Sequence, residues 1–342
     1  MIFSKKFLKV RHENPKRVFW WFNQLCNLRC NHCNIGGKMV CPGSVLGLTL
    51  KEKKKIVDKI SDWLDTGYSL SFIVGEPLMH ADILDLIKYA SNNGAKTSIT
   101  SNGTLITYKK AVEIIRSGLD YIAISLDSYD FEIHDKSRGV DGTRDRVFVA
   151  VANLKKAKGD GFCVKPRIYI NSIIMKNNLD ELVRLVKWVK KEQLDGITFQ
   201  PIAAAEFFGG KKKYKDDWYL KSDLWPEKND VFTLIDKLED LKKAGYPIAN
   251  SRNDFRRFRS YFENPIKFAN KENCESELSS VVITKDGKMK MCPALTEDFG
   301  SFLEDDLDKM WKSMAANRAR KHVYGCKSQC KILANNKEDF YF

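Results

Sequence analysis

The sequence predicts an α/β fold built on a parallel sheet, with a smaller region at its C-terminal end. Short apolar runs alternate with helical patterns between residues 17 and 202, which is typical of βαβ units. After residue 202 the alternation stops and a separate hairpin pattern follows. The 342 residues are 43% hydrophobic and 30% charged, which is enough for a large buried core in a globular protein.

Strands are predicted where β-branched and aromatic residues form short runs, and helices where the apolar residues recur with helical spacing. Thr49 is the expected N-cap of the first helix, and Gly94 and Gly118 stand where helices should end. The six predicted βα units are fewer than the eight of a closed TIM barrel. The strands are Arg17–Asn23, Leu70–Val74, Lys96–Ser101, Tyr121–Asp127, Arg167–Ile174 and Gly196–Ile202, and the helices are Leu50–Asp65, Ala81–Asn92, Tyr108–Ser117, Arg144–Ala157 and Leu179–Glu192.

The remainder of the chain has a different organisation. Residues 203–228 are irregular and rich in Gly, Lys and Asp, and a helix is predicted over Val231–Ala244. Asp286-Gly287 between two alternating runs predicts a hairpin of Ser280–Thr284 with Met289–Cys292. A last helix is predicted over Leu307–Arg320.

The net charge and the lengths of the apolar runs indicate which partners and which cellular location to expect. Fifty-eight Lys and Arg against 44 Asp and Glu give a net charge of +14, which favours anionic partners. No apolar run approaches the roughly 18 residues of a membrane span. The basic N-terminal segment is followed by an apolar stretch too short for a signal peptide, so we expect a cytoplasmic protein that does not enter a membrane.

Three of the nine cysteines follow the first predicted strand as C-x3-C-x2-C, at Cys26, Cys30 and Cys33. A disulfide framework is not expected in a chain of this length without an export signal, so the spacing indicates metal binding. Three thiolates can hold three irons of a 4Fe–4S cluster and leave the fourth open to a ligand. A zinc site remains the alternative, with His32 or Cys41 as its fourth ligand.

Four more cysteines lie in the C-terminal region. Cys274 and Cys292 bracket the predicted hairpin, and Cys326 and Cys330 form a C-x3-C pair after the last helix. Four thiolates saturate a 4Fe–4S cluster, so such a cluster has no open iron. A zinc site with four cysteine ligands is the alternative.

The motifs of the first 202 residues together resemble the radical SAM superfamily. The cysteine motif has the family spacing, with His32 in the position that is often aromatic. One departure stands out, because Val74 replaces the first glycine of the family's GGEP motif. The other matching segments, in chain order, are Gly75-Glu76-Pro77, Thr100-Ser101-Asn102-Gly103-Thr104, Ile124-Ser125-Leu126-Asp127 and His134-Asp135 with Arg138-Gly139.

The resemblance implies a partial (β/α)6 barrel of TIM type that binds a 4Fe–4S cluster and S-adenosylmethionine (SAM). The three front cysteines would hold the cluster, and Glu76 would accept a hydrogen bond from the ammonium group of SAM. Arg138 would pair with the SAM carboxylate, and Asn171 and Gln200 would contact adenine or substrate. The other residues expected to bind the cofactors are His32, Gly75, Pro77, Ser101, Asn102, Ser125 and Asp127.

The C-terminal cysteines resemble the SPASM/Twitch extension of radical SAM enzymes, which begins with a C-x(n)-G-x4-C pattern. Gly287 and Cys292 match that pattern, and four cysteines fit a Twitch-type extension with one auxiliary 4Fe–4S cluster. We therefore expect a small hairpin-plus-helix extension after the barrel. The expected division is a basic arm over 1–16, the barrel over 17–210, a basic linker and helix over 211–273, and the auxiliary cluster domain over 274–342.

The resemblance implies an oxidoreductase-type enzyme that cleaves SAM reductively to a 5′-deoxyadenosyl radical, which then abstracts hydrogen from a substrate. The first substrate class is a small polar or anionic molecule (a sugar, cyclitol or sugar nucleotide) that is oxidised or epimerised, with the auxiliary cluster as electron acceptor. The alternative is a ribosomally made peptide that receives a thioether, a C–C crosslink or an epimerised residue. Cys41 is a candidate hydrogen donor to a substrate radical, with a buried structural role as the alternative.

Basic clusters at Lys211–Lys215 and at Arg256, Arg257 and Arg259 allow two further interpretations. They can form a solvated face that docks an acidic flavodoxin or ferredoxin as reductant, or they can contact nucleic acid. A zinc-stabilised nucleic-acid-binding protein without chemistry is the third functional hypothesis, and the ordered barrel motifs argue against it.

Overall fold

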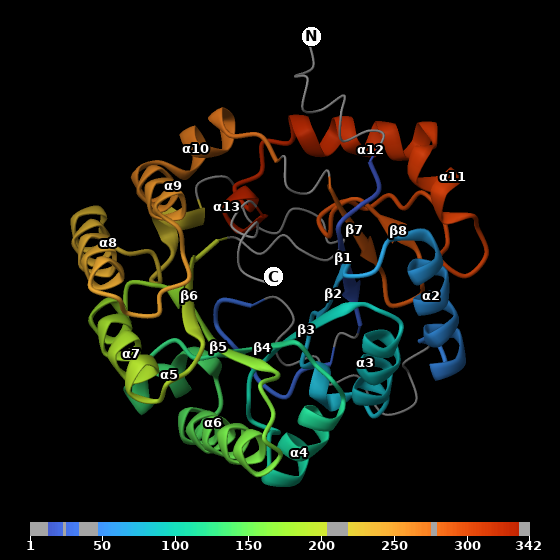
Figure 1. Ribbon diagram of the computed structural model, residues 1–342. Coiled ribbons are helices and arrows are strands. Elements are labelled where there is room, and N and C mark those ends of the chain that lie inside the picture. Colours follow the sequence, from blue (N-terminus) through green and yellow to red (C-terminus); the bar gives the residue numbers. More distant parts are fainter. Residues whose placement is uncertain (1–12, 23–24, 34–46, 204–217, 275–278, 335–342) are drawn as a thin grey trace.

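The computed structural model describes residues 13–22, 25–33, 47–203, 218–274 and 279–334. Its strands form one eight-stranded sheet in the order β6-β5-β4-β3-β2-β1-β7-β8, in which all neighbours are parallel except β7 and β8. Figure 1 shows the strands in an arc with helices along its outer side. The strands are β1 Arg17–Trp21, β2 Ser69–Ile73, β3 Lys96–Ser101, β4 Tyr121–Ser125, β5 Arg167–Ile174, β6 Gly196–Pro201, β7 Ser280–Ile283 and β8 Met289–Lys290.

The helices that follow β1 to β6 bury their apolar faces against the sheet, as Ile56, Val57 and Ile60 of α2 illustrate. No helix in the described part of the chain combines the length and the apolar character that crossing a membrane requires. The helices are α2 Leu50–Trp63, η1 Pro77–Met79, α3 Ile83–Asn92, α4 Tyr108–Arg116, α5 Phe131–Arg138, α6 Thr143–Asp160, α7 Leu179–Lys191, η2 Trp218–Lys221, α8 Lys228–Lys243, α9 Arg252–Glu263, α10 Pro265–Lys271, α11 Leu307–Lys312, α12 Met314–Gly325 and α13 Lys331–Ala334.

The predicted α/β fold and its six barrel strands are confirmed, with boundaries that agree to within two residues. Thr49 caps α2 as expected: its hydroxyl accepts a hydrogen bond from the backbone N–H of Glu52, and the Glu52 carboxylate accepts one from the backbone N–H of Thr49. Gly94 and Gly118 follow the last turns of α3 and α4 with φ of 84° and 75°. These left-handed conformations explain why glycine stands there.

The prediction of a single last helix is wrong. The chain forms α11 and α12 instead, separated at Ser313, which has an extended backbone with ψ of 163°. The Ser313 hydroxyl accepts a hydrogen bond from the N–H of Ala316 and so begins the second helix. Four α-helices, α5, α9, α10 and α13, were not predicted, and the break between α9 and α10 lies at Asn264, before Pro265.

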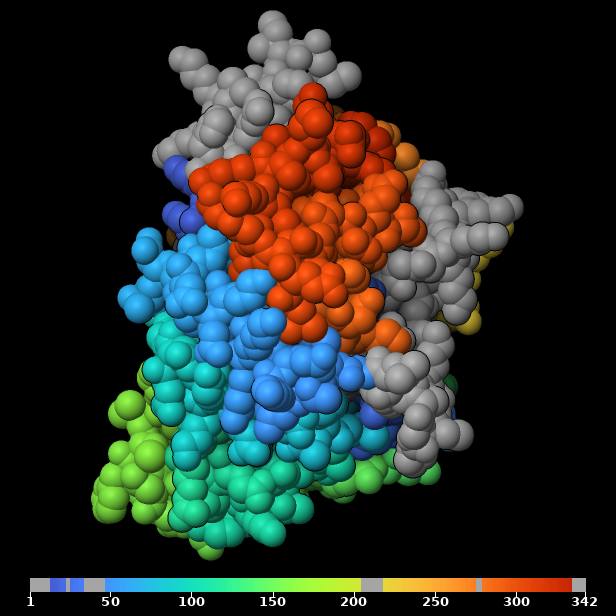
Figure 2. Space-filling model, turned by 90° about the vertical axis from the view of Figure 1, so that its right-hand side faces the viewer, coloured from blue at the N-terminus to red at the C-terminus, as the bar shows by residue number. Residues whose placement is uncertain are grey.

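The C-terminal hairpin is part of the barrel sheet. Strand β7 pairs in parallel with β1, with Val281 opposite Val18, and β8 continues the sheet in antiparallel direction. Figure 2 shows the C-terminal residues, in orange and red, packed directly on the blue α2 region. Trp311 of α11 lies edge-on to Trp63 of α2, with 5.9 Å between the ring centroids. The back cysteines are therefore carried by segments built onto the barrel wall.

Candidate functional site

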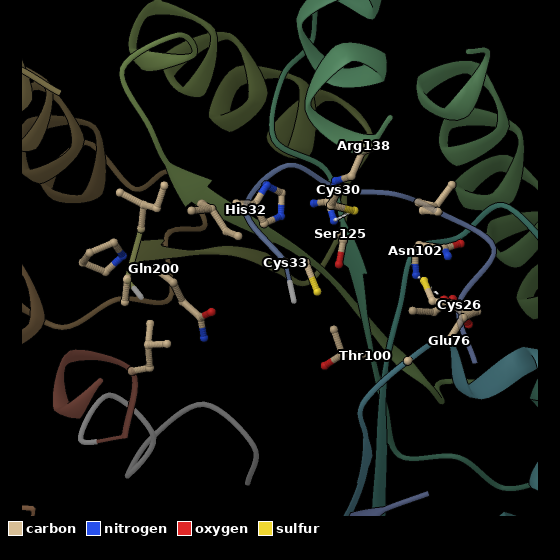
Figure 3. Close-up of a pocket in the computed structure, with 18 residues that line it drawn as sticks. Cys26, Cys30, His32, Cys33, Glu76, Thr100, Asn102, Ser125, Arg138 and Gln200 are labelled. Atoms are coloured by element: carbon tan, nitrogen blue, oxygen red, sulfur yellow. Dashed lines mark hydrogen bonds between the residues drawn. The ribbon is translucent and has the colours of Figure 1, made fainter. Parts of the chain in front are cut away.

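A cavity opens where the parallel strands β3 to β6 end, which is the edge at which α/β barrels place their active sites. It contains about 900 Å³ of space, part of it open solvent. Figure 3 shows the three front cysteines and Gln200 on different sides of this space. The lining residues are Cys26, Leu28, Cys30, His32, Cys33, Gly75, Glu76, Thr100, Ser101, Asn102, Ser125, Arg138, Ile173, Gln200, Pro201, Ile202, Ala203 and Leu333.

The three cysteines of the front motif all line the cavity. Burial raises the pKa of Cys26 to about 11, and the neighbouring Cys30, Glu76 and Cys33 add to this increase. Among the described residues, no three His, Cys, Asp or Glu side chains converge on a point where one metal ion would be held. Three thiols beside one cavity suit a cluster, because each thiolate binds a different iron and the cluster's charge would stabilise the ionised form.

Backbone hydrogen bonds connect the cysteine loop to the end of α5. The N–H of Arg29 donates to the carbonyl of Arg138 at 3.0 Å, and the N–H of Asn31 donates to the carbonyl of Ser137 at 3.0 Å. Gly139, with φ of 70°, lies so close that a Cβ there would be 2.4 Å from the carbonyl oxygen of Arg29. The glycine of the HDxxRG segment is thus required by this close approach.

Arg138 and Asp127 form a buried ion pair behind the cysteines. The Arg138 Nη2 lies 2.7 Å from Asp127 Oδ2, and Nη1 points to the Cys30 sulfur at 3.9 Å. Asp127 is fully buried, and its Oδ1 accepts a hydrogen bond from the N–H of Ile173 at 3.0 Å. Burial acts to raise the pKa of Asp127, but the Arg138 charge, the neighbouring histidines and the Ile173 N–H together outweigh it, so the pKa is lowered and the carboxylate stays ionised. The described cavity lining includes Arg138 but not Asp127, which orients it.

His134 is a buried structural residue of the same segment. Its Nδ1 accepts a hydrogen bond from the backbone N–H of Asp127 at 3.2 Å. Burial lowers the pKa of His134 to about 3, with the Arg138 charge adding to the effect, so the ring is neutral. The motif His134 to Gly139 therefore joins β4, α5 and the cysteine loop into one unit.

Glu76 lies at the end of the loop after β2 and is only 1% exposed. Its carboxylate accepts hydrogen bonds from the hydroxyl of Ser101 at 2.9 Å and from the backbone N–H groups of Asn102 at 2.6 Å and Leu78 at 3.1 Å. Burial raises the pKa of Glu76 to about 7 in spite of these donors. A cationic group bound in the cavity would lower the pKa of Glu76 and so favour its ionised form.

Val74 departs from the glycine of the family motif and adopts a strained backbone. Its φ is 79°, and Gly75 follows with φ of 66°. A positive φ is unfavourable for a β-branched residue because the Cβ approaches the backbone oxygen. The loop thus keeps a glycine-type geometry although one glycine has been replaced.

The other predicted cofactor residues divide into two groups. His32, Gly75, Ser101, Asn102, Ser125 and Gln200 line the cavity. The described lining does not include Pro77, which is buried in the first turn of η1, or Asn171, whose Oδ1 accepts a hydrogen bond from the hydroxyl of Thr198 at 2.9 Å. Cys41 and Lys211–Lys215 lie outside the described residues. Within the other basic cluster, Arg257 is buried and Arg259 pairs with Asp236 and Glu239.

Sequence reasoning missed seven residues that line the cavity, and most of them are apolar: Leu28, Thr100, Ile173, Pro201, Ile202, Ala203 and Leu333. Thr100 belongs to the segment Thr100 to Thr104 that matches the family motif, and the alternation of side chains along β3 directs it toward the cavity. Ile173 is half-buried near the end of β5. Leu333 comes from α13, just after Cys330, and nothing in its local sequence indicates that this helix reaches the barrel.

The back cysteines stand at the ends of four elements: Cys274 follows α10, Cys292 follows β8, Cys326 ends α12 and Cys330 precedes α13. Cys274 and Cys330 are buried, whereas Cys292 and Cys326 are half-buried. Backbone N–H groups point to two of the sulfurs, from Ala294 to Cys292 at 3.4 Å and from Ser328 to Cys326 at 3.3 Å. Such N–H donors stabilise thiolates bound to iron.

Comparison with known proteins gives the family. The model of the "Radical SAM superfamily" matches residues 22–199, and that of an "Iron-sulfur cluster-binding domain" (SPASM) matches residues 274–331. The curated relatives include an AdoMet-dependent heme synthase of Methanosarcina barkeri, 26% identical over 178 residues that make up 52% of this chain and 48% of that protein. Mycofactocin maturase MftC of Mycolicibacterium smegmatis is 28% identical over 168 residues, 49% of this chain and 40% of the maturase. The chain spans about half the length of the curated relatives it matches.

Solved structures share the fold. SuiB of Streptococcus suis bound to S-adenosylmethionine has a TM-score of 0.66 at 16% identity, over 91% of this chain and 67% of that chain. anSMEcpe with bound AdoMet has a TM-score of 0.64 at 17% identity, over 95% and 92% of the two chains. The two family matches cover the front motif and all four back cysteines. The chain therefore belongs to the radical SAM superfamily, as an enzyme that uses SAM and a 4Fe–4S cluster in its barrel and an auxiliary iron–sulfur centre in a C-terminal SPASM domain.

Proposed function

We propose that this enzyme abstracts a hydrogen atom from a side chain of a peptide or protein substrate. The proposal selects the second of the two substrate classes expected from the sequence. It depends on one observation, the composition of the cavity wall around Gln200, which lies opposite Cys26 and Glu76 in Figure 3 and is called the far wall. This wall consists of residues from β5, β6, the chain just after β6, and α13.

This far wall is almost entirely apolar. In its described part Gln200 is the one polar side chain, and the others are Ile173, Pro201, Ile202, Ala203 and Leu333. A sugar or cyclitol has several hydroxyl groups, each of which needs a partner when it is removed from water. An apolar wall with one amide suits a hydrocarbon side chain beside a single peptide group.

Two of the compared proteins support a peptide substrate. A structure of SuiB is bound to its precursor peptide SuiA, and another of anSMEcpe contains the Cp18Cys peptide. The heme synthases point to a different substrate, a tetrapyrrole. In the described cavity lining the one arginine or lysine is Arg138, which pairs with Asp127, so the lining offers little to the carboxylates of a tetrapyrrole.

The residues of the chain would divide the work as follows. Cys26, Cys30 and Cys33 would hold the barrel cluster, which together with SAM supplies the radical that removes the hydrogen atom. Glu76 would accept a hydrogen bond from the SAM ammonium group, with its carboxylate fixed by Ser101 and Asn102. Arg138 would neutralise anionic charge beside Cys30.

The far wall would hold the substrate and exclude water. Gln200 would orient a peptide group, and Leu333 would cover the side chain that reacts. The auxiliary centre would accept the electron that an oxidised substrate radical loses, and an acidic flavodoxin or ferredoxin would supply electrons to the barrel cluster. Cys41 stays a predicted hydrogen donor.

The substrate class can be identified through the fate of the abstracted hydrogen. Source cells are grown in deuterated medium, and their extract is separated into a peptide and protein fraction and a small-molecule fraction. Each fraction is incubated anaerobically with reconstituted enzyme, SAM and dithionite, and deuterium in 5′-deoxyadenosine is measured by mass spectrometry.

We expect deuterium transfer from the peptide and protein fraction. Transfer from the small-molecule fraction alone would refute the peptide proposal and return attention to sugars, cyclitols or tetrapyrroles. The matched control is the enzyme with Cys26, Cys30 and Cys33 replaced by Ala, which should give no 5′-deoxyadenosine with either fraction.

A further inference from the structure

Two buried cations, Lys331 and Arg257, lie beside the back cysteines. Lys331 follows Cys330 directly and is 1% exposed. Its Nζ donates hydrogen bonds to the carbonyls of Ala269 and Glu272, both at 2.7 Å. Glu272 precedes Cys274 by two residues, so this one side chain joins the two segments that carry Cys274 and Cys330.

Arg257 strengthens the same junction from α9. Its Nη2 donates to the carbonyl of Lys331 at 3.2 Å, and its Nε lies 3.6 Å from the Glu272 carboxylate. The guanidinium also lies over the ring of Phe268, 5.4 Å from its centroid. Arg257 therefore has a carboxylate partner, whereas the Lys331 ammonium donates its two hydrogen bonds to neutral carbonyls.

Lys331 lies next to the centre that the back cysteines would hold. It adjoins Cys330 in the chain, and its ammonium group contacts the carbonyl of Glu272, two residues before Cys274. Four thiolates on an iron–sulfur core leave a net negative charge, and each added electron makes it more negative.

We propose that Lys331 is the charge-compensating positioning residue of the auxiliary iron–sulfur cluster and raises its midpoint potential. The ammonium group is buried, so solvent screens its charge weakly, and reduction of a nearby cluster becomes more favourable. A higher potential makes the cluster a better electron acceptor. The proposal concerns the auxiliary cluster alone and holds for any substrate.

The test measures the potential of that cluster in isolation. Cys26, Cys30 and Cys33 are replaced by Ala, so that the remaining paramagnetic signal belongs to the auxiliary cluster. In this background Lys331→Gln removes the charge but keeps N–H donors for the two carbonyls, and Lys331→Arg keeps the charge. The midpoint potential is measured by anaerobic redox titration followed by electron paramagnetic resonance, with iron counted for each variant.

Lys327 provides the matched control. It is an exposed lysine between Cys326 and Cys330, and its Nζ donates to the carbonyl of Asn270 at 3.0 Å. Lys327→Gln removes the same charge from the same loop, at a place where water screens it. We expect Lys331→Gln to lower the midpoint potential clearly more than Lys327→Gln, and Lys331→Arg to restore it.

The remaining outcomes are also decisive. Equal potentials in Lys331→Gln and Lys327→Gln would overturn the proposal. Loss of iron in Lys331→Gln with retention in Lys331→Arg would support it, because the charge would then be needed to form the cluster. Loss of iron in both Lys331 variants would overturn it, because the lysine would then serve only to cap α10.

Discussion

Gly139→Ala should damage the front cluster site more than its backbone conformation alone explains. Gly139 has φ of 70°, and an added Cβ would lie 2.4 Å from the carbonyl oxygen of Arg29. Gly142 is the matched control, because its φ is 71° and an added Cβ would meet nothing within 4 Å. Both variants should lose roughly 1–2 kcal/mol of folding free energy, because each places a residue with a Cβ in the left-handed conformation. The difference between them isolates the contact with the cysteine loop.

The size of that difference follows from the local contacts. To reach ordinary van der Waals distance, the Arg29 backbone must move by about 1 Å. That shift breaks or weakens the two backbone hydrogen bonds from Arg29 and Asn31 to the end of α5, at about 1 kcal/mol each. At about 2.1 cal/mol/K per residue over 342 residues, 2 kcal/mol corresponds to a difference of about 3 °C in melting temperature.

The assay compares melting temperatures of the two cluster-free variants and the iron bound after anaerobic reconstitution. We expect Gly139→Ala to melt about 3 °C below Gly142→Ala, and to lose the barrel cluster while it keeps the auxiliary one. Equal melting temperatures and equal iron in the two variants would refute the argument that α5 clamps the cysteine loop.

Three further predictions concern the same cavity. Replacement of Cys26, Cys30 and Cys33 by Ala should lower the bound iron from about eight to about four atoms per chain and abolish SAM cleavage. Full SAM cleavage by this variant would contradict the cluster assignment. Val74→Gly should be more stable than Val74→Ala by about 0.5–1 kcal/mol. Glycine relieves the strain of the positive φ, and this gain is partly offset because glycine loses more chain entropy on folding. Denaturant unfolding measures the difference, and an Ala variant as stable as the Gly variant would show that the loop is not strained. Because the pKa of Glu76 is raised to about 7, its carboxylate forms as pH rises through that value, so SAM affinity should increase by about tenfold from pH 6 to pH 8. Equilibrium dialysis should show this increase in the wild type and a weaker, pH-independent affinity in Glu76→Gln, and a flat wild-type profile would contradict the role of Glu76.

The sequence predicted the barrel strands well because each is a short run of β-branched, aromatic and other largely buried residues between turn residues. It also predicted the residues whose chemistry is local, such as the C-x3-C-x2-C motif and the cap at Thr49. It could not show what long-range packing decides. Asp127 forms a buried pair with Arg138, eleven positions later, and lies outside the described cavity lining, so its contact with the cofactor stays a prediction. Leu333 was missed because a four-residue helix has no pattern of its own.

The pairing of β1 with β7 bears on how the protein is made. Arg17 lies opposite Ser280, so these partners are 263 positions apart (280 minus 17). During synthesis one hydrogen-bonding edge of β1 stays open until β7 has been made, because no earlier described strand occupies that edge. The cysteine loop follows β1 directly. Chains truncated before β7 would keep that edge exposed beside the cysteine loop, so they should accumulate as aggregation-prone species.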